Sequence, residues 1–306
     1  MTGAGGFVGA NLVRRLVAEG APVVAAVRPG ADAWRLDGVG AEVRELDLED
    51  LGALRRAVAA IRPRIVFNLA AHGAYSWQTD LERMLRVNVL ATAALREAAA
   101  AAGVERIVHA GSSSEYGFQD HPADELDALA PNSDYAATKA AATHLLAQSA
   151  PPGPLTCVLR LYSVYGPWEE PGRLIPTLVA AAARGMLPPL ADPAISRDFV
   201  YVEDAVDALL AAASRPLAHS TVINVSTGAQ TTLAELVAVA RDLFGVRAEP
   251  VWGTMAPRAW DTSVWSGRPD RARALLGWEA ATSLAAGLER TAEWLRADEE
   301  RAARYG

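Results

Sequence analysis

Short apolar runs alternate with longer amphipathic stretches over the first half of the chain. The runs predict buried strands, whereas the stretches repeat their hydrophobic residues every three or four positions, which is typical of helices with one buried face. This alternation favours an α/β fold with a doubly wound parallel sheet. The predicted strands are 23–27, 42–46, 65–69, 106–110 and 155–161. One predicted helix ends near Glu19, and the others span 51–61, 80–102 and 134–149.

Beyond residue 161 the alternation becomes irregular, beginning with a predicted loop over 162–176. The elements predicted after it are a helix ending near Arg184, a strand over 198–202, a helix from Glu203, strand 222–225, helix 232–244 and a final helix from Ser283. We expect the strand over 198–202 and the helix after it to return to the main sheet. Because neither an internal repeat nor a linker is visible, the smaller second domain is expected to be interleaved with the first.

The first strand of such a sheet is short in this sequence. A buried strand usually needs about four to six apolar residues, and only Met1 and Thr2 precede Gly3. We therefore expect the natural chain to begin upstream, with part of its first strand missing here. N-terminal sequencing of the native protein tests this expectation.

Composition and charge narrow the class of protein. A net charge of −7 argues against a nucleic-acid partner and against binding to an anionic membrane surface. The single cysteine, Cys157, excludes an internal disulfide, and we expect a cytoplasmic protein. Charged residues and prolines interrupt the long apolar runs, so no membrane span is predicted. The five histidines show no metal-ligand spacing, which predicts no metal site, and most are expected on the surface or in loops.

Three glycines mark a turn between a strand and a helix. Gly3, Gly6 and Gly9 lie in the segment Thr-Gly-Ala-Gly-Gly-Phe-Val-Gly, directly before an apolar-periodic helix. Glycine at these positions permits a tight turn, close approach of the backbone to a pyrophosphate and close packing of helix on strand. A second β-like run follows, as a βαβ unit requires. The turn therefore predicts a dinucleotide site.

The end of the next strand indicates which dinucleotide is bound. NAD-binding proteins of this kind commonly carry an acid there, which holds the ribose 2′-hydroxyl. This chain has Arg28 at that position and Arg35 in the loop that follows. A guanidinium can bind a 2′-phosphate, whereas an acid repels it. We therefore predict NADP as the cofactor, with NAD as the alternative.

A tyrosine and a lysine four residues apart share one helix face. Of 29 basic residues, Lys139 is the only lysine, and Tyr135 lies one turn before it. A phenol with a pKa of about 10 is a poor acid or base at neutral pH. A nearby ammonium and an oxidised nicotinamide are expected to lower that pKa. With Ser112 at the end of strand 106–110, these residues are predicted to be catalytic in hydride-transfer chemistry.

These motifs resemble the extended short-chain dehydrogenase/reductase family. Later segments are similar to the nucleotide-sugar epimerase, dehydratase and ketoreductase branch of this family. These are 160–167, 197–204, Arg258 with Asp270, and Leu276-Gly-Trp278. The resemblance covers essentially the whole chain. It implies a Rossmann domain that binds NAD(P) and a smaller domain that binds a nucleotide-diphosphate sugar. It also implies a homodimer formed through helices 80–102 and 134–149. The implied division is 1–161 with about 195–224 for the first domain, and 162–194 with 225–306 for the second.

Motifs and resemblance together give the expected site. The cofactor contacts are expected from Gly3, Gly6, Phe7, Val8, Gly9, Arg28, Arg35, Asp47, Leu48, Leu69, Ala70, Ala71, Asn88, Tyr135, Lys139 and Tyr162. The substrate contacts are expected from His72, Ser113, Ser114, Ser163, Arg197 and Arg258. Arg197 and Arg258 are candidates for the diphosphate, and His72 with Tyr75 and Trp77 for the sugar pocket. Trp252, Trp260 and Trp265 are possible stacking surfaces, although core packing is the favoured interpretation for them.

The sequence also discriminates between reactions. The family often has asparagine where Ser163 stands, and its dehydratases usually carry acids where this chain has Ser113 and Ser114. Dehydration needs such an acid/base, and Glu115 lies one position late. An epimerase keeps and recycles its cofactor, which fits tightly held NAD. Arg28 predicts NADP instead, and this fits a net reduction. We therefore predict a 4-ketoreductase of a nucleotide-linked 4-keto-6-deoxy sugar, with 4-epimerase and then 4,6-dehydratase as alternatives.

Two other classes of protein remain alternatives. A non-catalytic dinucleotide sensor would have no need of the Tyr135 and Lys139 pair. A reductase of small carbonyl compounds would have no need of Arg197 and Arg258.

Overall fold

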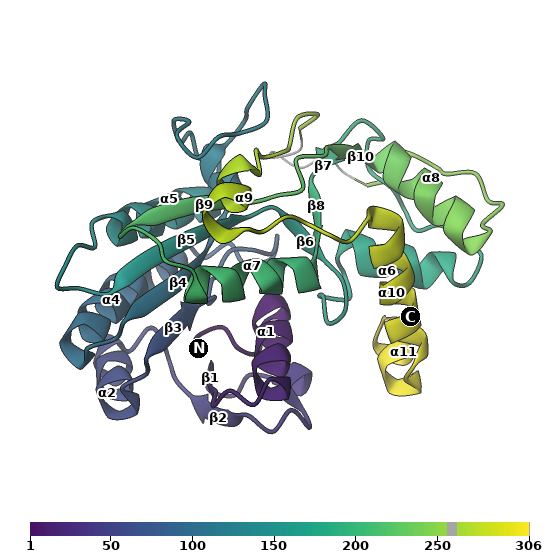
Figure 1. Cartoon of the computed structure of the whole chain (residues 1–306). Coiled ribbons are helices and arrows are strands. Elements are labelled where there is room, and N and C mark those ends of the chain that lie inside the picture. The colour runs from purple at the N-terminus through teal and green to yellow at the C-terminus, as the bar shows by residue number, and fades with distance from the viewer. Residues whose placement is uncertain (256–261, 306) are drawn as a thin grey trace.

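The computed structural model describes residues 1–255 and 262–305. Its main sheet consists of four parallel strands in the order β3-β4-β5-β9 (Figure 1). A second parallel pair, β1-β2, lies beside β3. The strands are β1 Val24–Val27, β2 Glu42–Glu45, β3 Ile65–Asn68, β4 Arg106–Ser112, β5 Leu155–Leu161 and β9 Thr221–Val225. They confirm the predicted doubly wound parallel sheet.

The first two residues connect the two groups of strands. Met1 forms hydrogen bonds with the backbone of β1, at 2.8 Å, and Thr2 bonds to the backbone of β3 and the residue after it, at 3.0 and 3.2 Å. Residues 1–2 therefore lie between β1 and β3 and make one continuous surface of the two groups. The turn with the three glycines leaves this surface at its centre.

Helices cover both faces of the sheet, and most were predicted within two residues. The helix expected over 80–102 is continuous, but its middle, Leu85–Leu90, is π-helical. A long apolar and alanine-rich pattern does not reveal such a local change of hydrogen bonding. The helices of this part are α1 Phe7–Ala18, α2 Leu51–Ile61, α3 Leu81–Met84, α4 Ala91–Ala102, α5 Asp134–Ala147 and α7 Val202–Ser214.

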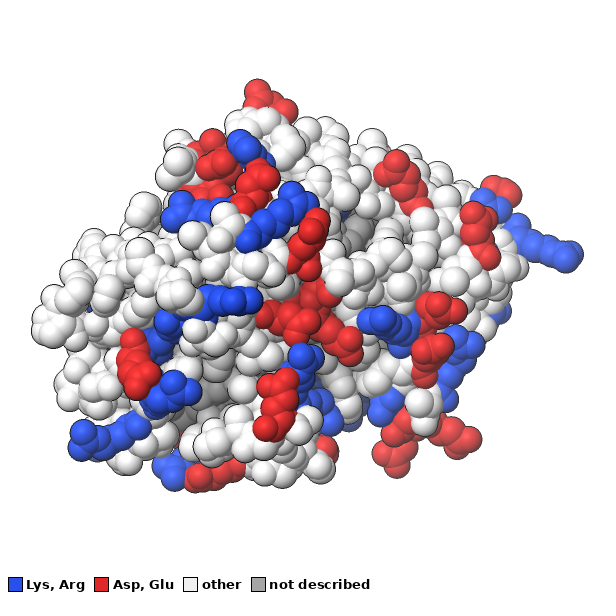
Figure 2. All heavy atoms as spheres, viewed as in Figure 1, with Lys and Arg blue, Asp and Glu red and all other residues white. Residues whose placement is uncertain are grey.

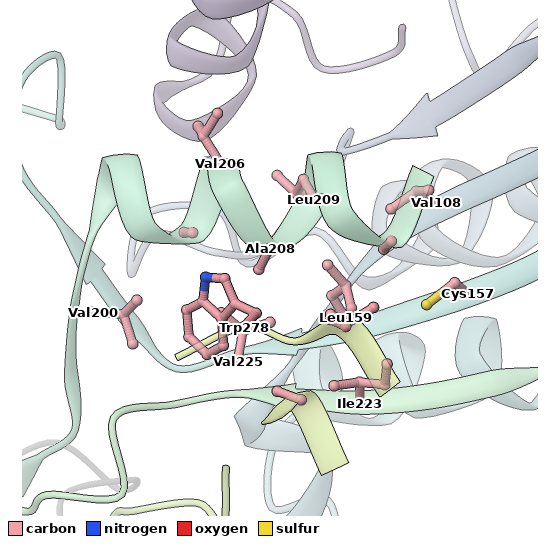
Figure 3. Close-up of a cluster of buried hydrophobic side chains, with 14 of the residues drawn as sticks. Val108, Cys157, Leu159, Val200, Val206, Ala208, Leu209, Ile223, Val225 and Trp278 are labelled. Atoms are coloured by element: carbon pink, nitrogen blue, oxygen red, sulfur yellow. The ribbon is translucent and has the colours of Figure 1, made fainter. Parts of the chain in front are cut away.

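A tight apolar cluster fixes the carboxyl ends of the central strands. Figure 3 shows Leu159 of β5 and Trp278 beneath Ala208 of α7, with Ile223 of β9 next to them, whereas Val206 points to the opposite side of α7. The Trp278 indole donates a hydrogen bond of 2.8 Å to the Asp204 carbonyl, which satisfies its polar atom. Each buried side chain of this size contributes roughly 1.5–3 kcal/mol. The cluster thus holds the strand ends that carry the site.

The second lobe is built from short strands and four helices, seen at the right of Figure 1. A separate apolar cluster, which includes Tyr165, Leu178, Leu236 and Leu288, packs its elements together. Its strands are β6 Ser163–Tyr165 with β8 Phe199–Tyr201, parallel, and β7 Ser196–Arg197 with β10 Thr231–Thr232, antiparallel. Its helices are α6 Leu174–Ala182, α8 Leu233–Phe244, α10 Leu284–Arg296 and α11 Glu299–Tyr305.

Two predictions for this lobe were wrong. The strand near 198–202 does not return to the main sheet: β8 pairs with β6, and only α7 after it packs on the sheet. All three β8 residues are buried, so an apolar run gives no sign of which sheet receives it. The predicted loop over 162–176 contains β6 and the start of α6, and α9 (Asp270–Leu276) was not predicted.

Charges of both signs are scattered over the face drawn in Figure 2, with no continuous basic surface there. None of the helices in the described ranges is long and apolar enough to cross a membrane. In the same ranges, no group of three or more His, Cys, Asp or Glu side chains is placed to hold a metal ion.

Candidate active site

A cleft of about 1190 Å³ opens at the carboxyl ends of the parallel strands and extends to the second lobe. Residues that follow β1, β2, β3, β4 and β5 all line it. This is the place where open α/β sheets bind ligands, because the loops after adjacent strands diverge there. The cleft therefore brings the predicted cofactor and substrate residues to one site.

The glycine turn forms the floor of the cleft. A Cβ on Gly3 would lie 2.5 Å from the Ala70 nitrogen, and one on Gly9 would lie 2.1 Å from the Gly3 carbonyl oxygen. Gly3 also has a φ of +68°, which favours glycine. Since Gly6 caps α1 without a side chain, the first N–H groups of the helix remain available to phosphate oxygens. The turn fits a dinucleotide pyrophosphate.

The adenosine side of the cleft contains one of the two predicted arginines. Arg28 is exposed and lines the cleft, and its guanidinium makes no hydrogen bond or ion pair with any residue that the structure describes. Arg35 does not line the cleft. It is buried, with Nε donating to the Trp168 carbonyl at 2.7 Å and Nη2 to Glu170 at 2.9 Å. The remaining predicted residues of this side that line the cleft are Gly3, Gly6, Phe7, Val8, Gly9, Asp47, Leu48, Leu69, Ala70 and Ala71.

Ser112 and Tyr135 meet in the middle of the cleft. Ser133 caps α5 by accepting a hydrogen bond from the Ala136 N–H, which fixes the start of the helix and with it Tyr135. Burial raises the pKa of Tyr135 to about 12, and a hydrogen bond with Ser112 opposes the rise. Burial outweighs the charges of the surrounding side chains, and the lowering expected from an oxidised nicotinamide stays a prediction. The phenol is therefore an acid that keeps its proton at neutral pH.

Lys139 lies one turn further along α5 and also lines the cleft. It is 2% exposed, and its Nζ donates a 2.6 Å hydrogen bond to the Ala110 carbonyl. Burial lowers the pKa of Lys139 to about 8, and the charge of Glu115 opposes this. The ammonium therefore remains mostly charged at neutral pH but is close to losing its proton.

The loop with His72 is held from behind by Asn88. The Asn88 side chain accepts a hydrogen bond from the His72 N–H and donates one to the His72 carbonyl, both 2.8 Å. It also donates to the Thr138 hydroxyl at 2.9 Å. Asn88 is buried and does not line the cleft, so it positions the loop instead of forming a wall.

Most predicted substrate residues line the cleft. They are His72, Ser113, Ser114, Ser163 and Arg197, together with Tyr162 from the cofactor set. Arg197 lies over the Trp265 ring, with 5.3 Å to the centroid, and Trp265 lines the cleft. Trp252 packs in the second-lobe cluster, as its core interpretation predicted. Arg258 and Trp260 lie outside the described residues.

Glu115 faces away from the cleft. It is fully buried, with Oε2 at 2.9 Å from Arg160 Nε and Oε1 accepting a 2.8 Å hydrogen bond from the Ser112 N–H. It is not among the cleft-lining residues. Glu115 is thus a structural partner of Arg160. Its spacing had left open whether it stands where dehydratases carry an acid, and its position facing away from the cleft does not support that role.

Glu169 is a cleft residue that the sequence did not indicate. It is 4% exposed, and its Oε1 lies 3.5 Å from Arg173 Nε, while Oε2 has no hydrogen-bond partner in the described ranges. Burial raises the pKa of Glu169 to about 7, and Arg173 opposes the rise. Glu169, Arg173 and Tyr75 all line the same part of the cleft. A buried carboxyl with an unused oxygen in a cleft indicates a ligand contact.

Side chains from three distant elements fix the loop that carries Glu169. The carbonyls of residues 167, 168 and 169 accept hydrogen bonds from Asn11 of α1, Arg35 and Tyr305 of α11, respectively. Trp168 has a φ of +72°, a conformation that a tryptophan rarely adopts. Such strain persists where the surroundings over-determine the backbone, and it is typical of functional loops.

Comparisons with known proteins agree with this geometry. A family model described as the NAD dependent epimerase/dehydratase family matches residues 1–226. UDP-glucose 4-epimerase of Mycolicibacterium smegmatis is 31% identical over 314 residues, which cover 97% of each chain. dTDP-6-deoxy-L-talose 4-dehydrogenase (NAD(P)(+)) of Kitasatospora kifunensis is 34% identical over 259 residues, 81% of this chain and 79% of that protein.

A solved structure is equally similar. MoeE5 in complex with UDP-glucuronic acid and NAD superimposes with a TM-score of 0.83 at 36% identity, covering 97% of this chain and 98% of that one.

Proposed function

The chain belongs to the NAD-dependent epimerase/dehydratase family of extended short-chain dehydrogenases/reductases, and from this premise we propose that it reduces the C4 ketone of a nucleotide-linked 4-keto-6-deoxy sugar with NADPH. The observation that carries the direction of the reaction is Arg28. Its guanidinium at the end of β1, without a bonded partner among the described residues, suits a 2′-phosphate and therefore the cellular NADPH pool.

The site residues divide the work of the reaction. The glycine turn and the start of α1 bind the cofactor pyrophosphate. Bound there, a reduced nicotinamide would supply the hydride that the C4 ketone needs. Ser112 holds the C4 oxygen by a hydrogen bond, and the Tyr135 hydroxyl, kept protonated by burial, gives that oxygen its proton. Lys139, which lines the cleft beside Tyr135, supplies positive charge that stabilises the phenolate that remains.

Dehydration is the reaction least compatible with this site. It needs an acid/base beside C5 and C6 of the sugar, in addition to the hydride machinery. Ser113 and Ser114 line the cleft where that group would stand, and a hydroxyl is too weak an acid or base for the task. Glu115, the acid next to these serines in the sequence, is engaged by Arg160.

A 4-epimerase is the second candidate, and the similarity to UDP-glucose 4-epimerase over nearly the whole chain favours it. Epimerisation would require the keto sugar to present its other face to the same cofactor.

A two-stage experiment tests the proposal. A thermal-shift screen of nucleoside diphosphates, with and without NADP, first identifies the base. Purified protein is then incubated with a 4-keto-6-deoxy sugar nucleotide of that base and NADPH. Stoichiometric NADPH oxidation supports reduction. Interconversion of sugars without net cofactor change establishes the epimerase instead, and the absence of both rejects either reaction.

We also propose the division of the chain into two interleaved domains, with one refinement. The first comprises 1–161 and 202–224, the second 162–201 and 225–306. Phe199 and Tyr201 pack in the second-lobe cluster, which supports placing the start of the return at α7 instead of near 195. The cytoplasmic location remains a prediction.

A homodimer through α3–α4 and α5 is supported by apolar exposure. Leu81, Leu85 and Leu90 are each 44–47% exposed. The π-helical turn brings Leu85 and Leu90, five residues apart, to one side. Light scattering should give the mass of a dimer, and Leu85→Glu should yield monomers. A monomeric native protein would contradict this assembly.

A further inference from the structure

A chain of buried polar side chains runs from Lys139 into the core. Lys139 Nζ lies 3.3 Å from Nε2 of His109, a β4 residue, and His109 Nδ1 lies 3.0 Å from the Asn68 amide. Asn68 also bonds to the hydroxyls of Thr2 and Thr92, at 2.6 and 3.2 Å. Each of the five side chains is at most 5% exposed. His109 is thus an exception to the expectation that histidines occupy the surface or loops.

The His109 ring is neutral in this environment. Burial holds its pKa well below the ordinary histidine value, and the charge of Lys139 lowers it further. A neutral imidazole has one N–H donor and one bare acceptor nitrogen. Which nitrogen carries the proton is therefore determined by Lys139 on one side and by Asn68 on the other.

Both protonation states of Lys139 have a complete hydrogen-bond arrangement with His109. If the Asn68 nitrogen donates to Nδ1, the proton on Nε2 points to Nζ, and a neutral Lys139 amine accepts it. If the amide is turned over, its oxygen accepts from Nδ1, and the bare Nε2 accepts from a Lys139 ammonium. The histidine can thus change tautomer when Lys139 changes charge, so no buried polar group is left unpaired.

We propose that His109 is a positioning residue for the reaction, which holds Lys139 Nζ in place in both charge states and keeps it charged at neutral pH. The Ala110 carbonyl is its other acceptor. The titratable groups around Lys139 are His109 from β4, Glu115 before α5 and Tyr135 on α5 itself. The π-helical segment and α4 contribute Asn88 and Thr92, which do not titrate.

Replacing His109 by an apolar side chain should release the Lys139 proton at lower pH. The ammonium would lose an acceptor while remaining desolvated, which disfavours its charged form. In His109→Phe we expect the midpoint of Lys139 titration to fall by roughly 1 pH unit. His109→Gln keeps a side-chain oxygen as acceptor, and it should restore most of the shift.

The sequence makes the measurement direct. Lys139 is the only lysine in 306 residues, so protein labelled with ¹³C at lysine Cε gives a single side-chain resonance when it carries no lysine-containing tag. Its chemical shift is followed against pH in the wild type, His109→Phe and His109→Gln. His144→Phe, on the exposed side of α5, is the matched control and should titrate like the wild type.

The outcomes distinguish a role of His109 in positioning Lys139 from a role in core packing alone. A fall in His109→Phe with recovery in His109→Gln supports the proposal. An unchanged midpoint in His109→Phe, or an equal fall in both variants, overturns it. If His109→Phe does not fold, Asn68→Ala interrupts the chain from the other end, and an unchanged Lys139 midpoint there overturns the proposal as well.

The effect of His109→Phe on the pH profile of the reaction rests on the proposed function. The titration of the Lys139 resonance does not depend on it. With a 4-keto sugar nucleotide and NADPH, the alkaline limb of the pH profile should move down by the same interval in His109→Phe. A shifted resonance in a protein that never oxidises NADPH would reject the proposed reaction and leave the role of His109 intact.

Discussion

The two walls of the cleft are stabilised in different ways. The cofactor wall is formed by a short contiguous segment, in which the glycines of residues 3–9 pack against the residues after β3. The substrate wall around Glu169 depends on partners more than 130 residues away, including Asn11 and Arg35. The first wall has no strained residue other than glycine, whereas the second contains a strained Trp168 and a carboxyl oxygen without a partner among the described residues. Unmet polar groups are expected where a family varies its substrate, since they are satisfied only by the correct ligand.

The largest expected effect is on the residue that serves both walls. Tyr135→Phe removes the proton donor but keeps the ring, and we expect kcat to fall about 10²–10⁴-fold. The Kd for NADPH should remain nearly unchanged, because the glycine turn is unaffected. Single-turnover kinetics measures the loss, and near-normal turnover would remove Tyr135 from the catalytic role.

Lys139→Arg is the companion variant. It keeps a positive charge, but a planar guanidinium does not reproduce the single 2.6 Å contact with Ala110 in a fully buried site. We expect activity to be lost together with part of the thermal stability.

Glu169→Gln should raise the stability of the substrate wall and impair its function. Burial raises the pKa of the carboxyl to about 7 in the folded protein, above its ordinary value of 4.5. The folded state therefore binds its proton more tightly, and stability falls as pH rises from 4.5 to 7. The ionised group costs up to about 3 kcal/mol above pH 7. The variant should thus unfold at a temperature a few degrees higher at pH 8, and at nearly the same temperature at pH 4.5.

Chemical denaturation at the two pH values measures this difference. Glu203→Gln, at an exposed ion pair, is the control and should show little change with pH. The KM for the sugar nucleotide should rise in Glu169→Gln. If Glu169→Gln differs from the wild type by the same stability at both pH values, ionisation of the Glu169 carboxyl does not destabilise the folded protein.

Arg28→Ala tests the cofactor wall. We expect the Kd for NADPH to rise roughly 10- to 100-fold, because a charge-assisted hydrogen bond contributes about 1.5–3 kcal/mol. The Kd for NADH should change little, since NADH has no 2′-phosphate. Fluorescence titration with both cofactors measures the two constants, and equal loss for both, or tighter binding of NADH to the wild type, would contradict the assignment.

The contrast between the walls also explains what the sequence could predict. The glycine turn, the strand ends and the Tyr135–Lys139 face depend on local spacing, and their residues line or underlie the cleft as expected. Arg35 was expected at the cofactor, but only the folded chain brings Trp168 and Glu170 to its guanidinium. Glu169 and His109 gave no signal, because a lone acid in a loop or a lone histidine in a strand acquires its meaning from tertiary burial.

The smallest expected effect tests whether the walls are coupled. Asn11 lies on the cofactor helix α1, yet its side chain donates a 3.0 Å hydrogen bond to the Pro167 carbonyl of the substrate wall. A single neutral hydrogen bond contributes about 0.5–1.5 kcal/mol, so Asn11→Ala should raise KM for the sugar nucleotide roughly 2- to 10-fold. The Kd for NADPH should stay constant because the helix start is intact. Arg15→Ala, on the outer side of the same helix, where Arg15 pairs with Asp207, is the matched control and should alter neither constant. If Asn11→Ala changes cofactor binding as much as KM, the two walls form one unit, and the separation argued from their packing fails.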